Sequence, residues 1–506
     1  MVVNIKNASA IILLKDDKVL LAQRNPNLKF LGGWHAFSGG KLDKSDAEIE
    51  VKNCEDVDLQ QFIVCAVREL FEEVGVLIVR NGDKLTRGQR ASLHDDLVSG
   101  RSTFQEILDD WNLWIDGEDF SYTGFWTTPP FSPVRFKTRF FIANCPPKQE
   151  PYEAIGEMQN IEFATPKEAL NRWEKSEILI SPPVLITLQE LEKIEPQRHR
   201  GTENKNSLLN SVSLCLCGEN LLEKSQMCDG NIEYVELNSR VIVMPLKTPT
   251  LPPATHTNCF IVGFKEFIVI DAASGDKNEQ AKLQVIIDNY LQAGNICKAI
   301  IVSHLHNDHH GGEIALQTYL REIYGVNVPI STHKLTAESL THIKFDKFIT
   351  DGDVYKLKDK NGEVFQIQTL HTRGHAKGLL AFYDAELGFL LSTDNVVGTG
   401  SVVIYPPEGE MQNYLNSLGR LKNLPNLRFL CGSHGSAIYN AKGKIEEYIS
   451  HRLEREKQII NLLENGAKTA EEIVEKLYVG LQPELIRLAI GSVNAHLEKI
   501  RAENLI

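Results

Sequence analysis

The sequence has no apolar run that approaches 18 consecutive residues, so it predicts no transmembrane helix and no membrane partner. Its nine cysteines are odd in number and scattered, which excludes a disulfide framework and favours reduced thiols in the cytoplasm. Positive charge is in deficit: 54 Lys and Arg against 67 Asp and Glu give a net charge of −13, which argues against a nucleic-acid-binding module. No low-complexity tract is present, and 42% hydrophobic with 24% charged residues is typical of a globular protein.

The 506 residues are enough for about three domains, and three blocks differ in pattern. The first block mixes strands with a few helices, the second alternates short apolar strands with helical patterns, and the last is helical. A polar segment with the composition of a linker separates the first two blocks. The expected divisions are residues 1–198, a linker at 199–230, a domain at 231–445 and a C-terminal domain at 446–506.

Three glutamates stand close together between Ala66 and Val76. Glu69, Glu72 and Glu73 have the spacing i, i+3 and i+4, which places them on one face of a helix that Gly75 ends. Carboxylates so arranged repel each other unless a cation neutralises them, and hard oxygen ligands suit Mg²⁺ or Mn²⁺. For the three glutamates alone, a solvated acidic helix face is the alternative.

The residues from Arg68 to Val76 resemble the second half of the Nudix box, G-x5-E-x7-R-E-U-x-E-E-x-G-U. Phe37-Ser-Gly-Gly40 resembles its glycine-rich start. Asp46 stands where the pattern has Glu, and 21 residues instead of seven separate it from Arg68. A long insertion at this point resembles the CoA-diphosphatase-like group of Nudix proteins, and the likeness covers most of residues 8–192.

This resemblance implies an α/β/α sandwich that hydrolyses a nucleoside diphosphate linked to another group, with CoA or acyl-CoA as the expected substrate. It implies that Glu69, Glu72 and Glu73 hold Mg²⁺ or Mn²⁺, and that Glu72 and Glu73 are catalytic. Arg68 is expected to orient a glutamate. The metal would polarise the diphosphate and activate a water for attack on phosphorus. Asp46 is one methylene shorter than Glu, so its role stays open, and the substrate-binding residues are unknown.

A second group of polar residues follows four apolar strands. The candidate ligands are His304, His306, Asp308, His309, His375, Asp394 and His434. Each stands just after the C-terminal end of a predicted strand, and such ends meet at one edge of an α/β core, where active sites form. Nitrogen and oxygen ligands with open positions suit Zn²⁺, with Mn²⁺ or Fe²⁺ as alternatives.

This pattern resembles the metallo-β-lactamase superfamily, an αββα sandwich. Residues 236–500 resemble its group with a C-terminal winged-helix-like domain. The resemblance implies that His304, His306 and His375 hold one metal ion, that Asp308, His309 and His434 hold a second, and that Asp394 bridges the two. It also implies that Asp308 is catalytic through orientation of the nucleophile, and that Asp271 supports the metal loop. Two metals roughly 3.5–4 Å apart can share a hydroxide that attacks a carbonyl or phosphoryl centre.

The sequence therefore predicts a multidomain α/β protein that is a bifunctional metal-dependent hydrolase of small molecules. The second site would act on a thioester, another ester or a phosphodiester, and the substrate would be a CoA derivative or a nucleoside diphosphate. The alternative is a single-strand endoribonuclease whose Nudix half senses a nucleotide. The C-terminal helices mix basic and acidic residues without a basic stripe, so charge does not support RNA as a partner.

Overall fold

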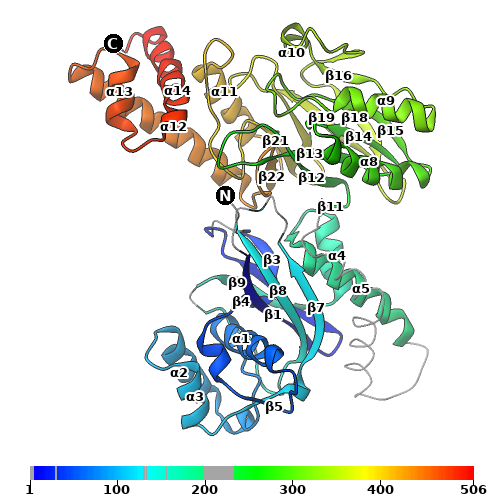
Figure 1. Ribbon diagram of the computed structural model, residues 1–506, viewed down its shortest axis with the longest axis vertical. Helices are drawn as coiled ribbons and strands as arrows, with labels where there is room; N and C mark the ends of the chain where they lie inside the picture. The colour runs from blue at the N-terminus through cyan, green and yellow to red at the C-terminus, as the bar shows by residue number, and fades with distance from the viewer. Residues whose placement is uncertain are drawn as a thin grey trace. The chain divides into compact units, whose positions relative to one another are not determined.

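The computed structural model describes residues 5–28, 31–128, 132, 134–154, 156–198 and 233–505. The expected linker, residues 199–230, lies outside the described residues. The chain divides into two compact units, 1–232 and 233–506, and each is described by itself (Figure 1).

The first unit is built on one mixed sheet with the strand order β10-β3-β2-β1-β8-β7, to which β4 adds on β1 and β9 on β2. Strands β1 and β8 are parallel over ten residue pairs and form its centre. The strands are β1 (Ile5–Lys15), β2 (Lys18–Arg24), β3 (Trp34–Ala36), β4 (Ser38–Lys41), β7 (Ser121–Thr127), β8 (Arg135–Asn144), β9 (Met158–Ala164) and β10 (Leu179–Ile180), with β5 (Val51–Lys52) and β6 (Ile115–Asp116) paired separately. The helices are α1 (Val57–Val74), α2 (Arg87–Val98), α3 (Phe104–Asp110), α4 (Pro166–Glu174) and α5 (Pro182–Arg198).

Alternation along β1 gives the sheet two apolar faces. Ile11 and Leu13 pack into one core with α1, α2 and α3, whereas Ile12 and Leu14 pack into the other core with α4 and α5. The result is the expected α/β/α sandwich. Helix α1 begins at the Asp56 cap, whose side chain accepts from the backbone N–H of Leu59, and ends at a left-handed Gly75 with a φ of 69°.

His35 in β3 gives the first unit a specific acid sensitivity. Its ring is 3% exposed, and burial lowers its pKa from 6.5 to about 4 with help from the nearby charge of Arg172. Because the unfolded chain takes up this proton first as the pH falls, the stabilising contribution is complete above pH 6.5 and is lost toward pH 4. We expect the free energy of unfolding to fall by about 3 kcal/mol over this range from this group alone. Hydrogen exchange of peptides covering β3, measured in the full chain across that range, should show the fall. In His35→Gln this component of the pH slope should be absent, and an identical slope in that variant would refute the assignment.

The second unit is built on a long, curled sheet with the order β11-β12-β13-β14-β18-β19-β20-β21-β22; β15 adds on β14, and β16 and β17 follow in turn beyond β15. Its strands are β11 (Val235–Asn238), β12 (Val241–Lys247), β13 (His256–Gly263), β14 (Glu266–Ile270), β15 (Ile296–Ile301), β16 (Ile330–His333), β17 (Lys347–Ile349), β18 (Val354–Lys358), β19 (Val364–His371), β20 (Leu380–Asp384), β21 (Phe389–Thr393) and β22 (Phe429–Gly432). Its helices are α8 (Lys277–Gln292), α9 (Glu313–Tyr324), α10 (Lys334–Ser339), α11 (Met411–Lys422), α12 (Ala441–Glu464), α13 (Ala470–Leu477) and α14 (Pro483–Ala502).

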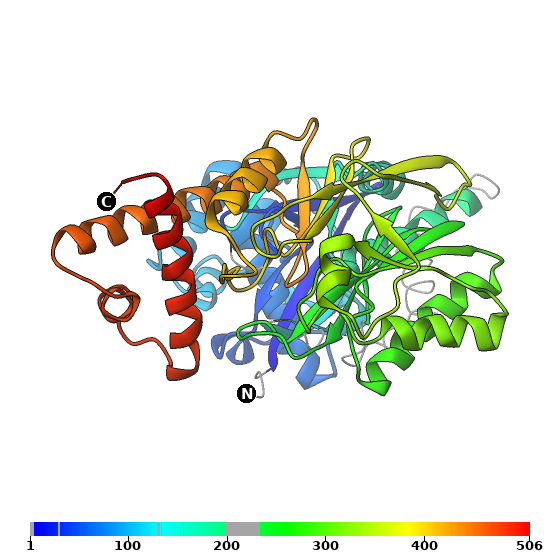
Figure 2. The ribbon, with the colours of Figure 1, turned by 90° about the horizontal axis from the view of Figure 1, so that it is seen from above.

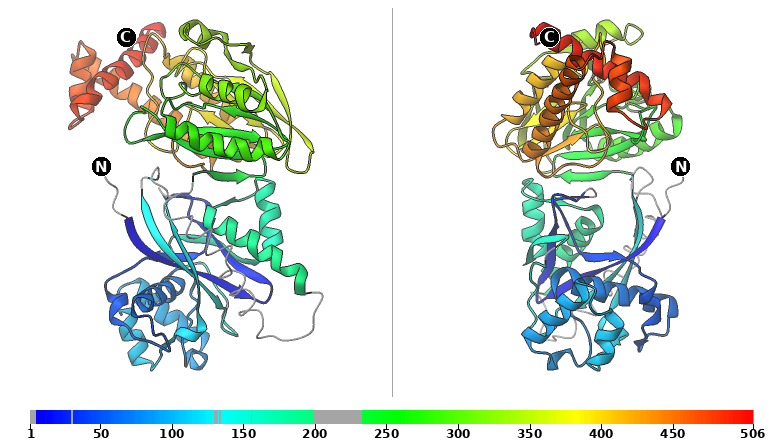
Figure 3. Two further views of the ribbon diagram at one scale, coloured as in Figure 1. Left: turned by 45° about the vertical axis from the view of Figure 1, so that its right-hand side comes forward. Right: turned by 90° about the vertical axis from the view of Figure 1, so that its left-hand side faces the viewer.

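Both faces of this sheet are buried, as an αββα sandwich requires. On β14, Phe267 and Val269 pack against α8 and α9, and the alternate residues Ile268 and Ile270 are equally buried on the opposite face. Figure 3 shows α8 and α9 side by side over their half of the sheet. Helices α11 and α12 cover the other half, where they share a core with β19 to β22.

The C-terminal helices form a small cluster of their own, drawn from orange to red in Figure 2. Asn465 caps α12, Thr469 caps α13 by accepting from the backbone N–H of Glu472, and Pro483 stands in the first turn of α14. These residues supply the stop and start signals of the three helices. Helix α12 runs without a break across the expected boundary at residues 445 and 446, so its first turns belong to the core of the sandwich.

No helix among the described residues is long and apolar enough to span a membrane.

Candidate functional site

Glu69, Glu72 and Glu73 lie on one face of α1, beside the edge of β4. A side-chain carbon placed on Gly40 would come within 2.4 Å of the Glu69 carboxyl group, so a larger residue at this position would push that carboxylate aside. The backbone N–H of Gly39 donates to Oε2 of Glu73 at 2.9 Å. The backbone of the glycine-rich segment therefore lies directly against the carboxylates of Glu69 and Glu73.

Arg68 and Asp46 form a buried clamp next to these glutamates. Nε and Nη2 of Arg68 donate to the two oxygens of Asp46 at 2.8 and 2.9 Å, and Asp46 is 1% exposed. Nη1 of Arg68 donates to Glu69 at 2.8 Å and approaches Glu72 at 3.4 Å. The sequence left the role of Asp46 open; the structure places it as the anchor of Arg68, despite the long insertion between them.

The glutamates are electrostatically strained without a cation. Burial raises the pKa of Glu69 to about 7 against the opposing charge of Arg68, and burial together with Glu69 raises the pKa of Glu73 to about 8. Burial also raises the pKa of Glu72. These carboxyl groups fit a divalent cation that would replace their protons. Their oxygens are not among the sets of described ligand atoms that all lie within 4.8 Å of one another, and Arg68 donates hydrogen bonds to Glu69 and Glu72.

The second unit brings all seven predicted histidine and aspartate side chains together. Each follows the strand from which it was expected, and the ends of β15, β19, β21 and β22 meet at one edge of the sandwich. Two sets have ligand atoms within 4.8 Å of one another: His304, His306, His375 and Asp394 in the first, and Asp308, His309 and His434 in the second. Nδ1 of His306 lies 3.0 Å from Nε2 of His304 and 2.9 Å from Nε2 of His375, so three ring nitrogens point at one spot.

Asp394 lies between the two sets. Its Oδ2 is 3.4 Å from Nε2 of His375 and 3.5 Å from Nε2 of His309, and its Oδ1 is 3.6 Å from Nε2 of His434. Asp308 completes the second set, with Oδ2 3.4 Å from Nε2 of His434. The carboxylate of Asp394 can therefore contact residues of both sets at the same time.

Hydrogen bonds on the far side of each ring fix which nitrogen faces the cluster. Nδ1 of His375 donates to the carbonyl of Val403 at 2.8 Å, and Nδ1 of His434 donates to the carbonyl of His256 at 3.0 Å. A carbonyl only accepts, so these rings carry the proton on Nδ1 and turn the lone pair of Nε2 inward. Such partners orient metal-binding histidines in general.

Asp271 fixes the loop that follows β15 through hydrogen bonds to its carboxylate. It is fully buried at the end of β14, and its carboxylate accepts from the backbone N–H and the hydroxyl of Ser303, both at 2.7 Å, and from Nδ1 of His309 at 2.8 Å. Ser303 in turn accepts from Nδ1 of His304 at 3.0 Å. One carboxylate thus orients a ring in each set.

The protonation states also suit a cation-binding site. Burial lowers the pKa of His304 well below its usual range, that of His306 to about 3, and that of His375, so these three rings are neutral with free lone pairs. Burial opposes protonation of His309 too, but the surrounding aspartates outweigh it and raise its pKa. Nε2 of His309 and Oδ1 of Asp394 are buried without a hydrogen-bond partner among the described residues.

The buried imidazoles and carboxylates converge, and two of their polar atoms have no hydrogen-bond partner among the described residues. Two divalent cations would satisfy these groups better than protons would. The first set would hold one ion and the second set the other, with Asp394 shared. Such ions supply Lewis-acid chemistry and an activated water.

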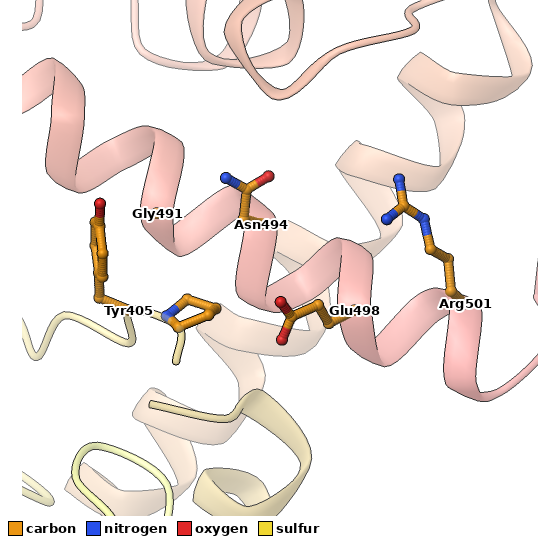
Figure 4. A pocket seen from close by; sticks show the side chains of 6 residues that line it. Tyr405, Gly491, Asn494, Glu498 and Arg501 are labelled. Atoms are coloured by element: carbon orange, nitrogen blue, oxygen red, sulfur yellow. The ribbon is translucent and has the colours of Figure 1, made fainter. Parts of the chain in front are cut away.

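The C-terminal helices brace the segment that holds His375. Arg452 of α12 is 5% exposed and donates to the carbonyl of Val402, next to the Val403 carbonyl that accepts from His375. Tyr405, two residues on, lies against α14 at Gly491, where both line a cavity of about 160 Å³ with Asn494, Glu498 and Arg501 (Figure 4). A side-chain carbon on Gly491 would lie 2.0 Å from Cδ2 of Tyr405.

Replacing Gly491 by alanine should therefore disturb the candidate metal ligand His375 from a distance. The methyl group would push Tyr405 and its segment away from α14, and the Val403 carbonyl would no longer fix the ring of His375. We expect Zn²⁺ affinity at the histidine cluster to fall about tenfold in a metal-competition titration. Gly419→Ala is the matched control, since a methyl group there meets nothing within 4 Å. Equal affinity in Gly491→Ala and wild type would contradict the bracing role.

The sequence missed several supporting groups. Ser303 could have been found, because it directly precedes the histidine motif and has a hydroxyl that can link two partners. Arg452 and the Val403 carbonyl could not, because no local pattern connects them to His375.

Three parts of the chain match known protein families. Residues 51–191 match the family model of the NUDT19 Nudix domain, residues 252–434 that of the metallo-beta-lactamase superfamily, and residues 469–506 that of the beta-lactamase associated winged helix domain. An atrochrysone carboxyl ACP thioesterase of Aspergillus chevalieri is 29% identical over 45% of this chain and 69% of its own. A putative nudix hydrolase 7 of Caenorhabditis elegans is 27% identical over 38% of this chain and 61% of its own. A metallo-beta-lactamase family protein from Thermus thermophilus is 23% identical and covers 53% of this chain and 95% of its own, with a TM-score of 0.42.

Proposed function

We propose that this chain, which joins a Nudix hydrolase domain to a metallo-β-lactamase hydrolase domain with a winged-helix appendix, hydrolyses acyl-CoA at two places. The Nudix site cleaves the diphosphate of the CoA moiety, and the histidine cluster cleaves the thioester. The six cysteines that the structure describes are free thiols, which fits the cytoplasmic location that we also propose.

The observation that carries the proposal is the histidine and aspartate cluster. Seven ligands from four strand ends form two sets joined by Asp394, and their rings are already turned inward by Asp271, Val403 and His256. Two Zn²⁺ ions held by these sets would polarise a carbonyl and supply a water for attack on it. We assign the orientation of that water to Asp308, whose carboxylate lies in the second set. A relative in the same part of the chain is a thioesterase for a carboxyl group on a carrier protein, which supports a thioester as the bond that breaks.

The Nudix site supplies the second half of the proposal. Glu69, Glu72 and Glu73 would hold Mg²⁺ or Mn²⁺ against the diphosphate, with Glu72 and Glu73 closest to the chemistry. Arg68, fixed by Asp46, keeps Glu69 and Glu72 in place. The long insertion before Arg68 is shared with the CoA-diphosphatase-like group, which supports CoA as the nucleotide.

A product assay with acetyl-CoA tests both halves in one experiment. Purified protein would be supplied with Mg²⁺ and Zn²⁺, and its products would be separated by mass spectrometry. Release of 3′,5′-ADP and acetyl-phosphopantetheine that Glu73→Gln abolishes and Asp308→Ala retains would support the Nudix half. Release of free CoA thiol with the opposite dependence on these variants would support the thioesterase half.

Three outcomes would count against the proposal. Intact acetyl-CoA, with metal bound at both sites, would exclude it. Cleavage of single-stranded RNA that Asp308→Ala abolishes and Glu73→Gln retains would favour the endoribonuclease. Tight nucleotide binding without turnover at the Nudix site, together with a changed rate at the cluster, would favour the sensor.

A further inference from the structure

Strand β8 carries three cations at alternate positions. Arg135, Lys137 and Arg139 share one face of the sheet, because side chains two residues apart on a strand point the same way. All three are partly buried. Such a row is unexpected in a chain whose net charge is −13.

This basic row lies on the same face of the sheet as the Nudix glutamates. The guanidinium carbon of Arg139 lies 3.9 Å from the ring centre of Phe62 on α1. Ser9 on β1 pairs with Arg139 on one side and with Gly40 on the other, and Gly40 faces the Glu69 carboxylate. Two strand spacings therefore separate Arg139 from Gly40, which is about 10 Å.

The row has no acidic partner within the described residues. Other arginines of the unit do pair with carboxylates: Arg68 with Asp46, and Arg80 with Asp116. By contrast, no carboxylate oxygen of the described residues lies within 4.0 Å of a charged nitrogen in the basic row. Partly buried cations without a counter-charge are unfavourable. An anionic ligand that binds on this face of the sheet would therefore be stabilised by them.

Among the described residues, the row makes its contacts with neutral groups. The ammonium group of Lys137 lies 4.2 Å from the ring centre of Phe125, and Nε of Arg135 donates to the carbonyl of Thr128. Thr127, the cross-strand neighbour of Lys137, has a buried hydroxyl with no hydrogen-bond partner among the described residues. This hydroxyl and the N–H groups of the row that make no hydrogen bond within the described part of the chain are available to bind oxygen atoms.

We propose that the basic row binds a second phosphate, carried on the nucleoside of the diphosphate substrate and separate from the scissile diphosphate. The inference rests on the proposed function and deepens it by assigning a specificity site. A phosphate monoester bears up to two charges and three acceptor oxygens, which matches three cations and a hydroxyl better than a single carboxylate does. Because Arg139 and Gly40 are separated by two strand spacings, the scissile diphosphate can bind at the glutamates while the second phosphate binds at β8.

CoA and 3′-dephospho-CoA test this assignment, because they differ only in that phosphate. We expect wild-type protein to prefer CoA at least tenfold in kcat/KM, with the difference in KM. In Lys137→Met, and separately in Arg135→Gln, the preference should fall toward one. Lys52→Met is the matched control: Lys52 also lies over an aromatic ring, that of Trp114 at 4.4 Å, but on the separate pair β5 and β6, so its preference should stay at the wild-type value. A preference that survives in both β8 variants would overturn the assignment.

Direct binding separates this inference from the proposed activity. Calorimetric titration with 3′,5′-ADP and with 5′-AMP needs no turnover. Tighter binding of 3′,5′-ADP that Lys137→Met removes would support the phosphate site even if acetyl-CoA proves not to be a substrate. Equal binding of the two nucleotides by the wild type would refute the site even if CoA is hydrolysed. Binding of single-stranded RNA through Lys137, tighter than that of 3′,5′-ADP, would reassign the row to nucleic acid and refute the inference as well.

Discussion

Replacing Asp394 by alanine is expected to lower hydrolysis at the histidine cluster by more than about 100-fold. Its two oxygens lie 3.4 Å from Nε2 of His375 and 3.6 Å from Nε2 of His434, so one carboxylate lies beside both sets of candidate ligands. Residues that only support metal ligands already cost about 10- to 100-fold when they are removed, and a shared ligand should cost more. Because burial would otherwise favour its protonated form, the low pKa of Asp394 depends on His309 and His434, and the three groups should respond as one.

The measurement is the rate of thioester hydrolysis together with metal content per chain after equilibration with Zn²⁺. We expect both the rate and the stoichiometry to fall, since the variant leaves the inward-turned nitrogens of both sets without their common carboxylate. Asp288→Ala is the control: Asp288 accepts from the hydroxyls of Tyr319 and Tyr324 in the same unit and serves no set. Full activity and two metal ions per chain in Asp394→Ala would show that the sets work without a shared ligand.

The sequence was most informative where function depends on strand ends. Ligands placed directly after apolar strands could be expected to meet, because the topology of an α/β core brings those ends to one edge, and the structure brings all seven together there. The helix of Glu69, Glu72 and Glu73 could also be predicted, because its periodicity and the left-handed Gly75 are local features.

Contacts that depend on tertiary packing could not be read in this way. The clamp between Asp46 and Arg68 crosses a long insertion, and the link from Arg452 through residues 402 and 403 to His375 joins three separate segments. The basic row on β8 shows the same limit. Its alternation is visible in the sequence, but only the register of β1 against both β8 and β4 shows that it shares a face with the glutamates.

Replacing Glu73 by glutamine is expected to lower diphosphate hydrolysis by more than about 100-fold while leaving the fold intact. Oε2 of Glu73 accepts from the backbone N–H of Gly39 at 2.9 Å, and the amide oxygen of glutamine can accept the same bond. What the change removes is the negative charge with which the proposed Nudix site would hold Mg²⁺ or Mn²⁺ against the repulsion between its own carboxylates. Burial already raises the pKa of Glu73 to about 8, so the neutral side chain should be well tolerated, and the unfolding temperature should not fall.

Two readouts make this expectation specific to the Nudix site. Release of 3′,5′-ADP from acetyl-CoA should be lost in Glu73→Gln, whereas thioester hydrolysis in the same sample should proceed at the wild-type rate, because the histidine cluster belongs to the other unit. The exposed Glu55, substituted in the same way, serves as the control for loss of one carboxylate charge. If Glu73→Gln retained diphosphate hydrolysis, the cation would have to be held by Glu69 and Glu72 alone. That result would move the catalytic centre toward Arg68, away from the backbone of Gly39.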